Sequence, residues 1–99
     1  VTKMAGNLLR LSPNKMSMNI KISNISLNTT DAELRKLFFQ YGNVDYAMVN
    51  RNSLNGRSLK SGEVCMPVSA QARQAIISLD KTTFNGKVIS VSELPTELY

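Results

Sequence analysis

Apolar and polar residues alternate with a period of two along short segments of the chain, which is the pattern of half-buried β-strands. The first segment begins at Asn19, where Ile20 and Ile22 alternate with Lys21 and Ser23. Further segments rich in β-forming residues are Val44–Asn50, Lys60–Met66 and Val88–Glu93. Four strands are therefore expected.

Two segments between these strands have the period of an α-helix. Thr30 and Glu33 have the spacing of a capping box, which marks a helix start. The apolar stripe that follows, ahead of a terminating Gly42, consists of Leu34, Leu37, Phe38 and Tyr41. The second helix is expected over Ala70–Asp80, with Ser69 as its N-cap.

The resulting order of elements is β-α-β-β-α-β, which predicts an α+β fold of the ferredoxin-like sandwich type. Two right-handed crossovers give a four-stranded antiparallel sheet with both helices on one face and the other face open. We expect the domain to occupy residues 19–93, with an N-terminal extension over 1–18 and a C-terminal tail over 94–99. On the open face, the alternation places Lys21 opposite Glu63.

The charge of the chain favours an anionic partner. It carries 12 Lys and Arg against 7 Asp and Glu, a net charge of +5. No acidic residue precedes Asp31, and none lies between Asp45 and Glu63. Basic residues in such acid-free stretches are candidates for phosphate contacts. They are Lys3, Arg10, Lys15, Lys21, Arg51, Arg57 and Lys60.

Residue types that several enzyme classes need are missing. The chain has no histidine and one cysteine, Cys65, which excludes Cys/His zinc sites, Ser-His-Asp triads and an internal disulfide. The longest apolar run, Tyr46–Val49, is too short to span a membrane. No Gly-rich phosphate cradle supports a small hydrolase on this sandwich. We therefore expect no catalytic residue, metal, cofactor, small-molecule substrate or membrane contact.

Residues 19–92 resemble an RNA recognition motif. Ile20–Ile25 stands where the family has its RNP2 hexamer, and Leu59–Met66 stands where it has RNP1. The remaining points of likeness are Leu34–Gly42, Ala72 and the turn Phe84–Lys87. At a finer level, Gly56–Leu59 resembles the entry to the third strand in Aly-type messenger RNA export adaptors. The resemblance implies an RNA-binding function.

The family stacks RNA bases on aromatic residues of the open sheet face, one from RNP2 and two from RNP1. This chain has Lys21, Ser61 and Glu63 at those positions, so its RNP motifs are degenerate. We therefore expect basic loop residues to hold the RNA. The candidate RNA-binding residues are Arg51, Arg57, Lys60, Lys21, Tyr46, Met48, Ser61 and Lys87.

These expectations describe a module that binds single-stranded RNA with modest affinity inside a larger RNA-processing, export or editing protein. Such a protein would act inside the cell, in the nucleus or in an RNA-processing organelle, and other proteins of an RNA-processing complex are candidate partners. The alternative is a protein-interaction domain of the same fold, whose sheet face or first helix docks a partner protein.

Overall fold

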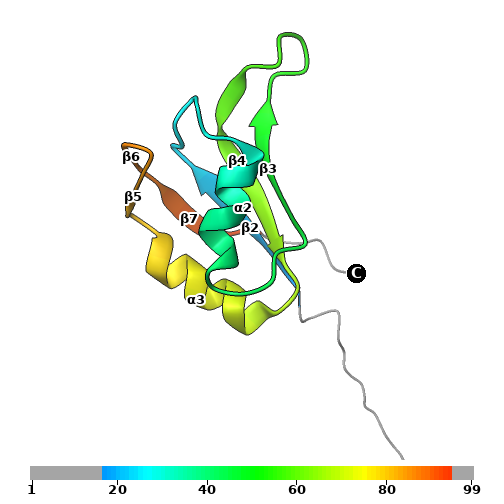
Figure 1. Ribbon diagram of the computed structural model, residues 1–99, viewed down its shortest axis with the longest axis vertical. Helices are drawn as coiled ribbons and strands as arrows, with labels where there is room; N and C mark the ends of the chain where they lie inside the picture. Colours follow the sequence, from blue (N-terminus) through cyan, green and yellow to red (C-terminus); the bar gives the residue numbers. More distant parts are fainter. Residues whose placement is uncertain (1–16, 95–99) are drawn as a thin grey trace, which may run out of the picture.

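The computed structural model describes residues 17–94 of the chain, and the predicted terminal segments lie almost wholly outside this range. The described elements follow one another in the predicted order, with one additional hairpin (Figure 1). They are β2 (Met18–Ser23), α2 (Asp31–Phe39), β3 (Tyr46–Arg51), β4 (Ser58–Met66), α3 (Ser69–Leu79), β5 (Thr83–Phe84), β6 (Lys87–Val88) and β7 (Ser90–Glu93).

The main sheet has four antiparallel strands in the order β3-β4-β2-β7, and both helices lie on one of its faces (Figure 1). The predicted α+β ferredoxin-like sandwich is thus confirmed. Ile22 is paired with Gly62 and Lys21 with Glu63, so the predicted register between the two central strands is also correct. Within residues 17–94, no helix has the length and apolar character needed to cross a membrane.

The core lies between the sheet and the helices, and its side chains come from the predicted apolar positions. Ile20 and Ile22 of β2 and Leu34 and Phe38 of α2 are fully buried. Gly62 allows α2 to approach the sheet closely, because a Cβ at this position would lie 2.7 Å from Leu34 Cδ2. It would also lie 2.8 Å from the backbone oxygen of Met48, so any larger residue would displace the helix or β3.

The start of α2 is fixed by the predicted capping box. The backbone N–H of Glu33 donates to Thr30 Oγ1 at 3.1 Å, and the backbone N–H of Thr30 donates to Glu33 Oε1 at 3.0 Å. The helix ends at Phe39, so Tyr41 packs against the core from beyond the last turn. Gly42 follows with φ of +151°, a conformation that L side chains rarely adopt.

The prediction that Ser69 caps the second helix is wrong. Val68 is the N-cap, and its carbonyl accepts the backbone N–H groups of Gln71 and Ala72, both at 3.1 Å. Ser69 is already the first helical residue, and the N-cap provides no side-chain hydrogen bond.

The predicted last strand is divided into two elements. Asn85 and Gly86 have φ of +50° and +82°, as in the tight turns that close two-residue hairpins. This turn joins β5 to β6 in a separate two-stranded sheet, so Val88 belongs to the hairpin. Only the later part of the predicted strand, β7, pairs with β2.

Candidate nucleic-acid interface

The open face of the sheet carries a row of four side chains across its middle. Met48 lies opposite Glu63, Glu63 lies opposite Lys21, and Lys21 lies opposite Ser92. Lys21 and Glu63 are neighbours as predicted, but they form no ion pair. Within residues 17–94, the ion pair shorter than 4 Å joins Lys81 to Asp80 at 3.7 Å. The carboxylate of Glu63 has a different partner.

That partner is Tyr46, on the edge strand β3. Its hydroxyl donates a hydrogen bond to Glu63 Oε2 at 2.7 Å, and its side chain is 39% exposed. This hydrogen bond, together with partial burial and the negative charge of Glu63, raises the pKa of Tyr46 to about 12. Tyr46 therefore stays neutral and adds no positive charge beside the carboxylate of Glu63, which repels phosphate from the middle of the face.

Cys65 lies opposite Tyr46 and is half-buried. Burial raises the pKa of its thiol, and the carboxylates of Asp45 and Glu63 raise it further, so the thiolate is disfavoured. Among the described residues, no three metal-binding side chains lie together.

A second row of polar side chains crosses the open face nearer the end where β4 begins. Asn50 Nδ2 donates to Ser61 Oγ at 3.0 Å, and Ser61 lies opposite Ser23, which in turn lies opposite Ser90. Ser61 thus replaces a stacking aromatic by a hydroxyl that is bonded to its neighbour. Asn50 is not among the predicted site residues, although its place in the alternation of β3 puts it on the same face as Tyr46 and Met48.

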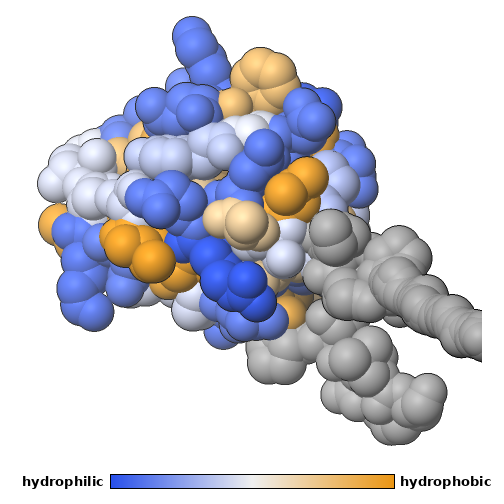
Figure 2. All heavy atoms as spheres, turned by 90° about the horizontal axis from the view of Figure 1, so that it is seen from below, coloured by the Kyte–Doolittle hydropathy of each residue, from blue (hydrophilic) through white to orange (hydrophobic). Residues whose placement is uncertain are grey.

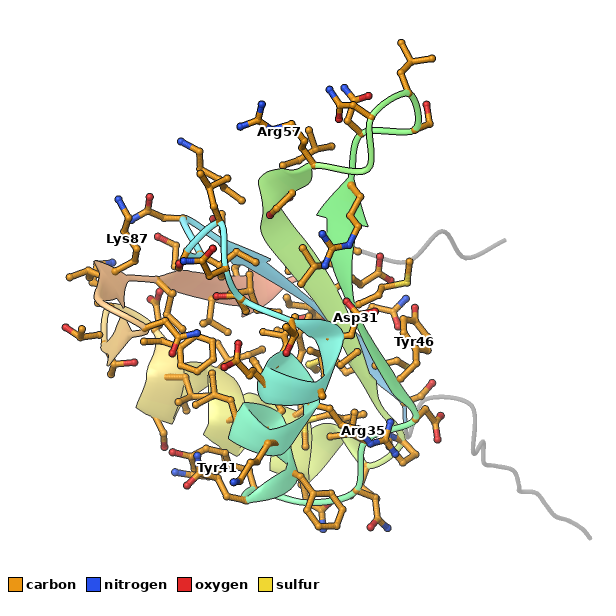
Figure 3. All side chains as sticks on the ribbon, turned by 45° about the horizontal axis from the view of Figure 1, so that its top comes forward. Asp31, Arg35, Tyr41, Tyr46, Arg57 and Lys87 are labelled. Atoms are coloured by element: carbon orange, nitrogen blue, oxygen red, sulfur yellow. The ribbon has the colours of Figure 1, made fainter. Side chains whose placement is uncertain are left out.

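The predicted basic residues Arg51, Arg57 and Lys60 surround the loop that joins β3 to β4, and all three are exposed. The loop is ordered by its own backbone. The N–H of Asn52 donates to the Arg57 carbonyl at 2.8 Å, and the N–H of Gly56 donates to the Asn52 carbonyl at 2.8 Å. Arg51 Nη1 donates to the Gly56 carbonyl at 3.4 Å. In Figure 3 the loop projects beyond the sheet, and Arg57 points away from the helices.

The register between β3 and β4 is irregular at the base of this loop. Val49 is paired with Gly62 and Arg51 with Ser58. The chain thus advances by four residues on β4 but by only two on β3, which is a β-bulge in β4. Lys60 lies in this bulge with φ of +65°. Arg51 lies on the β3 side of this irregularity, and its guanidinium is directed to the loop, where it contacts the Gly56 carbonyl. The irregularity and the loop thus hold Arg51, Arg57 and Lys60 in one region of the chain.

Lys87 extends this basic region to the β5–β6 hairpin. The loop between β2 and α2 connects the two parts, because the N–H of Ile25 donates to the Lys60 carbonyl at 3.1 Å and Asn24 Nδ2 donates to the Val88 carbonyl at 2.8 Å. In Figure 3, Arg57 and Lys87 lie far from Tyr41, which follows the C-terminal end of α2. We refer to Arg51, Arg57, Lys60 and Lys87 as the basic end of the sheet.

The structure thus divides the predicted site residues into two groups. Four of them form the basic end of the sheet. The other four lie on the open face. Lys21 and Met48 stand in the row that contains Glu63, Tyr46 lies beside that row, and Ser61 lies in the second row with Ser23 and Ser90.

The sequence pattern of the RNA recognition motif family matches residues 20–90. Among curated proteins, the chain is 34% identical over 79 residues to mouse scaffold attachment factor B1, covering 80% of this chain and 8% of that protein. It is 33% identical to the putative RNA-binding protein RbpE of Nostoc sp., covering 77% of both chains.

Solved structures of other proteins superpose on this chain. The RNA-binding protein PG1 superposes with a TM-score of 0.78 at 33% identity, over 83% of this chain and 99% of that one. Sex-lethal, in a protein/RNA complex, superposes with a TM-score of 0.77 at 23% identity, over 82% of this chain and 48% of that one, which supports the fold. The family is a non-enzymatic one. On the match over residues 20–90, this chain belongs to the RNA recognition motif family.

Proposed function

We propose that the chain is a single-stranded RNA-binding module that holds the RNA backbone at the basic end of its sheet. The observation that carries this proposal is the contrast between the two parts of the interface. The three stacking positions of the open face are Lys21, Ser61 and Glu63, whereas three exposed cations surround the β3–β4 loop and a fourth, Lys87, lies on the β5–β6 hairpin.

The energies of the two binding modes support this choice. A base stacked on an aromatic side chain contributes roughly 1–3 kcal/mol. Without the three aromatics, that contribution is lost, and Glu63 adds repulsion for a phosphate that crosses the middle of the face. Phosphate neutralisation by Arg51, Arg57, Lys60 and Lys87 is the favourable contribution that remains. Modest affinity with little sequence preference follows, because backbone contacts carry no base information.

The open face still offers contacts for one or two nucleotides. Tyr46 and Met48 are 39% and 47% exposed and form a small apolar area at the edge strand. A base that leaves the basic end can rest there, while Lys21 and Ser61 provide hydrogen-bond donors. In this arrangement the RNA runs along the β3 side of the sheet and avoids its centre.

The relatives suggest a setting for this module. Their names place them in several compartments, such as the chloroplastic 28 kDa ribonucleoprotein of Nicotiana sylvestris and the cytoplasmic and nuclear polyadenylate-binding protein of Chaetomium globosum. The chain covers 26% and 9% of these two proteins. We propose that it acts as part of a larger intracellular RNA-processing protein. More specifically, we propose that this larger protein acts in messenger RNA export, as Aly-type adaptors do, or in RNA editing.

Titration with fluorescent U-rich and A-rich single-stranded RNA at two salt concentrations tests the proposal. We expect similar affinities for both sequences, and a steep loss of affinity at the higher salt, by roughly 0.7 logarithmic units per phosphate contact for each tenfold rise in salt. Absence of binding at the lower salt would refute the proposal and favour the protein-interaction alternative.

A further inference from the structure

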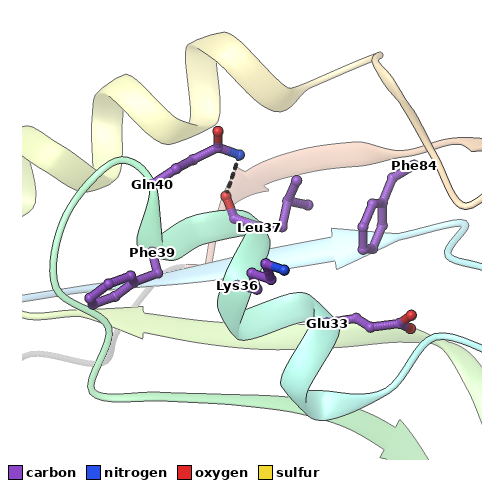
Figure 4. Close-up of a pocket in the computed structure, with 6 residues that line it drawn as sticks. All are labelled: Glu33, Lys36, Leu37, Phe39, Gln40 and Phe84. Carbon is purple, nitrogen blue, oxygen red and sulfur yellow. Dashed lines mark hydrogen bonds between the residues drawn. The ribbon is translucent and has the colours of Figure 1, made fainter.

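The outer surface of α2, on the side of the molecule away from the open face, has two adjoining hollows. The larger has a volume of about 560 Å³ and is lined by α2 and the β5–β6 hairpin (Figure 4). The smaller, of about 380 Å³, lies farther round the helix and is lined by Ala32, Arg35, Lys36 and Phe39. Lys36 and Phe39 line both hollows, so they form the ridge between them.

The walls of the larger hollow are mainly apolar. On the face of the molecule seen from below, apolar areas are small and lie among hydrophilic residues (Figure 2). Phe39 is 58% exposed although it is a large aromatic residue, and Phe84 of β5 faces the same hollow across Leu37 (Figure 4). Aromatic rings pair favourably with other rings in edge-to-face or offset arrangements. A hollow bordered by two phenylalanine rings from different elements therefore suits an aromatic side chain.

The charges around the hollows favour an acidic ligand. Within residues 17–94, the ammonium group of Lys36 has no hydrogen-bond or ion-pair partner. Arg35 donates from Nη2 to the Val44 carbonyl at 2.9 Å, which leaves its other nitrogens available. The one carboxylate at the rim, Glu33, already accepts from the Thr30 N–H at 3.0 Å. It also lies 3.4 Å from Asn85 Nδ2.

From this arrangement we infer that the α2 surface binds an acidic peptide segment of a partner protein that carries one aromatic side chain. The aromatic ring occupies the larger hollow between Phe39 and Phe84, and flanking carboxylates approach Lys36 and Arg35. The sheet separates this surface from Tyr46 and Met48 on the open face, whereas the β5–β6 hairpin contributes Phe84 to the larger hollow and Lys87 to the basic end. This inference goes beyond the proposed RNA-binding function and does not depend on it.

A peptide Gly-Asp-Glu-Asp-Phe-Asp-Glu-Gly, titrated into the isotope-labelled full chain and followed by amide NMR shifts, tests the inference. We expect saturable shifts in α2 and in the β5–β6 hairpin. Phe39→Ala and Lys36→Glu should each weaken binding by roughly tenfold, the effect of losing one anchor or reversing one charge. The matched controls Ile77→Ala and Lys81→Glu change an exposed apolar residue and an exposed lysine elsewhere, and they should leave the affinity unchanged.

Several results would overturn the inference. Shifts that are absent at millimolar peptide, or that persist in Phe39→Ala, would exclude the hollow as the site. Equal binding of a peptide with alanine in place of phenylalanine would exclude the aromatic anchor, and equal binding of its all-lysine counterpart would exclude the acidic preference. Saturable shifts of α2 on addition of RNA would assign the surface to nucleic acid. RNA affinity measured on Phe39→Ala tests the basic end separately and should equal that of the unmodified chain.

Discussion

The hydroxyl of Tyr46 donates a 2.7 Å hydrogen bond to the carboxylate of Glu63, which lies two residues along β4 from Cys65, the residue directly opposite Tyr46. This diagonal contact decides the character of the open face. It fixes the exposed aromatic residue of the edge strand beside the negative charge at the centre. A phosphate is therefore repelled from the place where the remaining ring lies, which directs the backbone of a bound strand toward the basic end.

The hydrogen bond from Tyr46 to Glu63 predicts that the tyrosine loses its proton at an unusually high pH. Its phenolate should form with a pKa of about 12, because the hydrogen bond to Glu63 stabilises the neutral phenol. The folded pKa is higher than the unfolded value of 10.0, so the contribution to stability is complete below pH 10 and is lost as the pH rises to 12. Ultraviolet titration of the phenolates should show a component near 12 that is absent in Tyr46→Phe. In Glu63→Gln, a component that remained at 12 would contradict the assignment.

A pair of aspartates protects the two edges of the sheet. Asp31, at the start of α2, accepts the backbone N–H of Val49 in β3 at 2.7 Å. Asp80, at the end of α3, accepts the backbone N–H of Val91 in β7 at 2.8 Å. Both valines are buried residues of edge strands, whose outward N–H groups would otherwise be free to pair with another chain.

Replacing either aspartate by alanine should destabilise the domain by about 1–3 kcal/mol, because a part-buried N–H loses its acceptor. The free energy of unfolding in urea measures this effect, and light scattering should show that the variants self-associate more readily than the unmodified chain. Asp45→Ala is the matched control, since this exposed carboxylate makes no hydrogen bond within residues 17–94. A loss of stability in Asp45→Ala as large as in Asp31→Ala would show that charge, and not edge protection, is responsible.

Lys60 combines an unfavourable backbone conformation with a useful charge. A side chain at φ of +65° is strained by roughly 1–2 kcal/mol, and glycine relieves this strain at some cost in chain entropy. Lys60→Gly should therefore raise the free energy of unfolding by up to about 1 kcal/mol while lowering the affinity for RNA. The measurements are urea unfolding and RNA titration on the same samples.

Lys81→Gly is the matched control for Lys60→Gly, because Lys81 also has a positive φ, of +64°, and follows α3, away from the basic end. Lys81→Gly should stabilise the domain to a similar extent and leave RNA affinity nearly unchanged. Equal losses of RNA affinity in the two variants would mean that net charge, and not the position of Lys60, governs binding.

Most of the fold could be predicted from the sequence, because strand alternation and helix capping are local signals. The pairing of Lys21 with Glu63 followed from the burial of Ile22 and Val64, since a shift by one residue would have turned both to the wrong face. The Thr30 cap was equally predictable. Ser69 was misplaced because Val68, with its extended backbone, takes the capping position without any side-chain signal.

The details of the candidate site were less predictable. The bulge at Lys60 depends on how β3 and β4 continue into their loop, which no spacing within either strand reveals. The Tyr46–Glu63 contact is diagonal and depends on the reach of two long side chains, whereas the sequence suggested Lys21 as the partner of Glu63. The larger hollow on α2 requires Phe84 to come near Leu37, and this follows from tertiary packing of the hairpin.

The most direct measurement for the central claim is the salt dependence of RNA affinity in a variant with Arg51, Arg57 and Lys60 all changed to alanine. Its matched control changes Lys36, Arg73 and Lys81 to alanine, which removes the same charge from other exposed positions. Tyr46→Ala provides the comparison for stacking on the open face.

Our account predicts that the first variant binds weakly and that the slope of log affinity against log salt falls by about 2, or roughly 0.7 for each of three lost phosphate contacts. The matched control should retain nearly the full slope, and Tyr46→Ala should lose little affinity. If the first variant binds as tightly as the unmodified chain while Tyr46→Ala abolishes binding, the account is contradicted and the RNA lies on the open face.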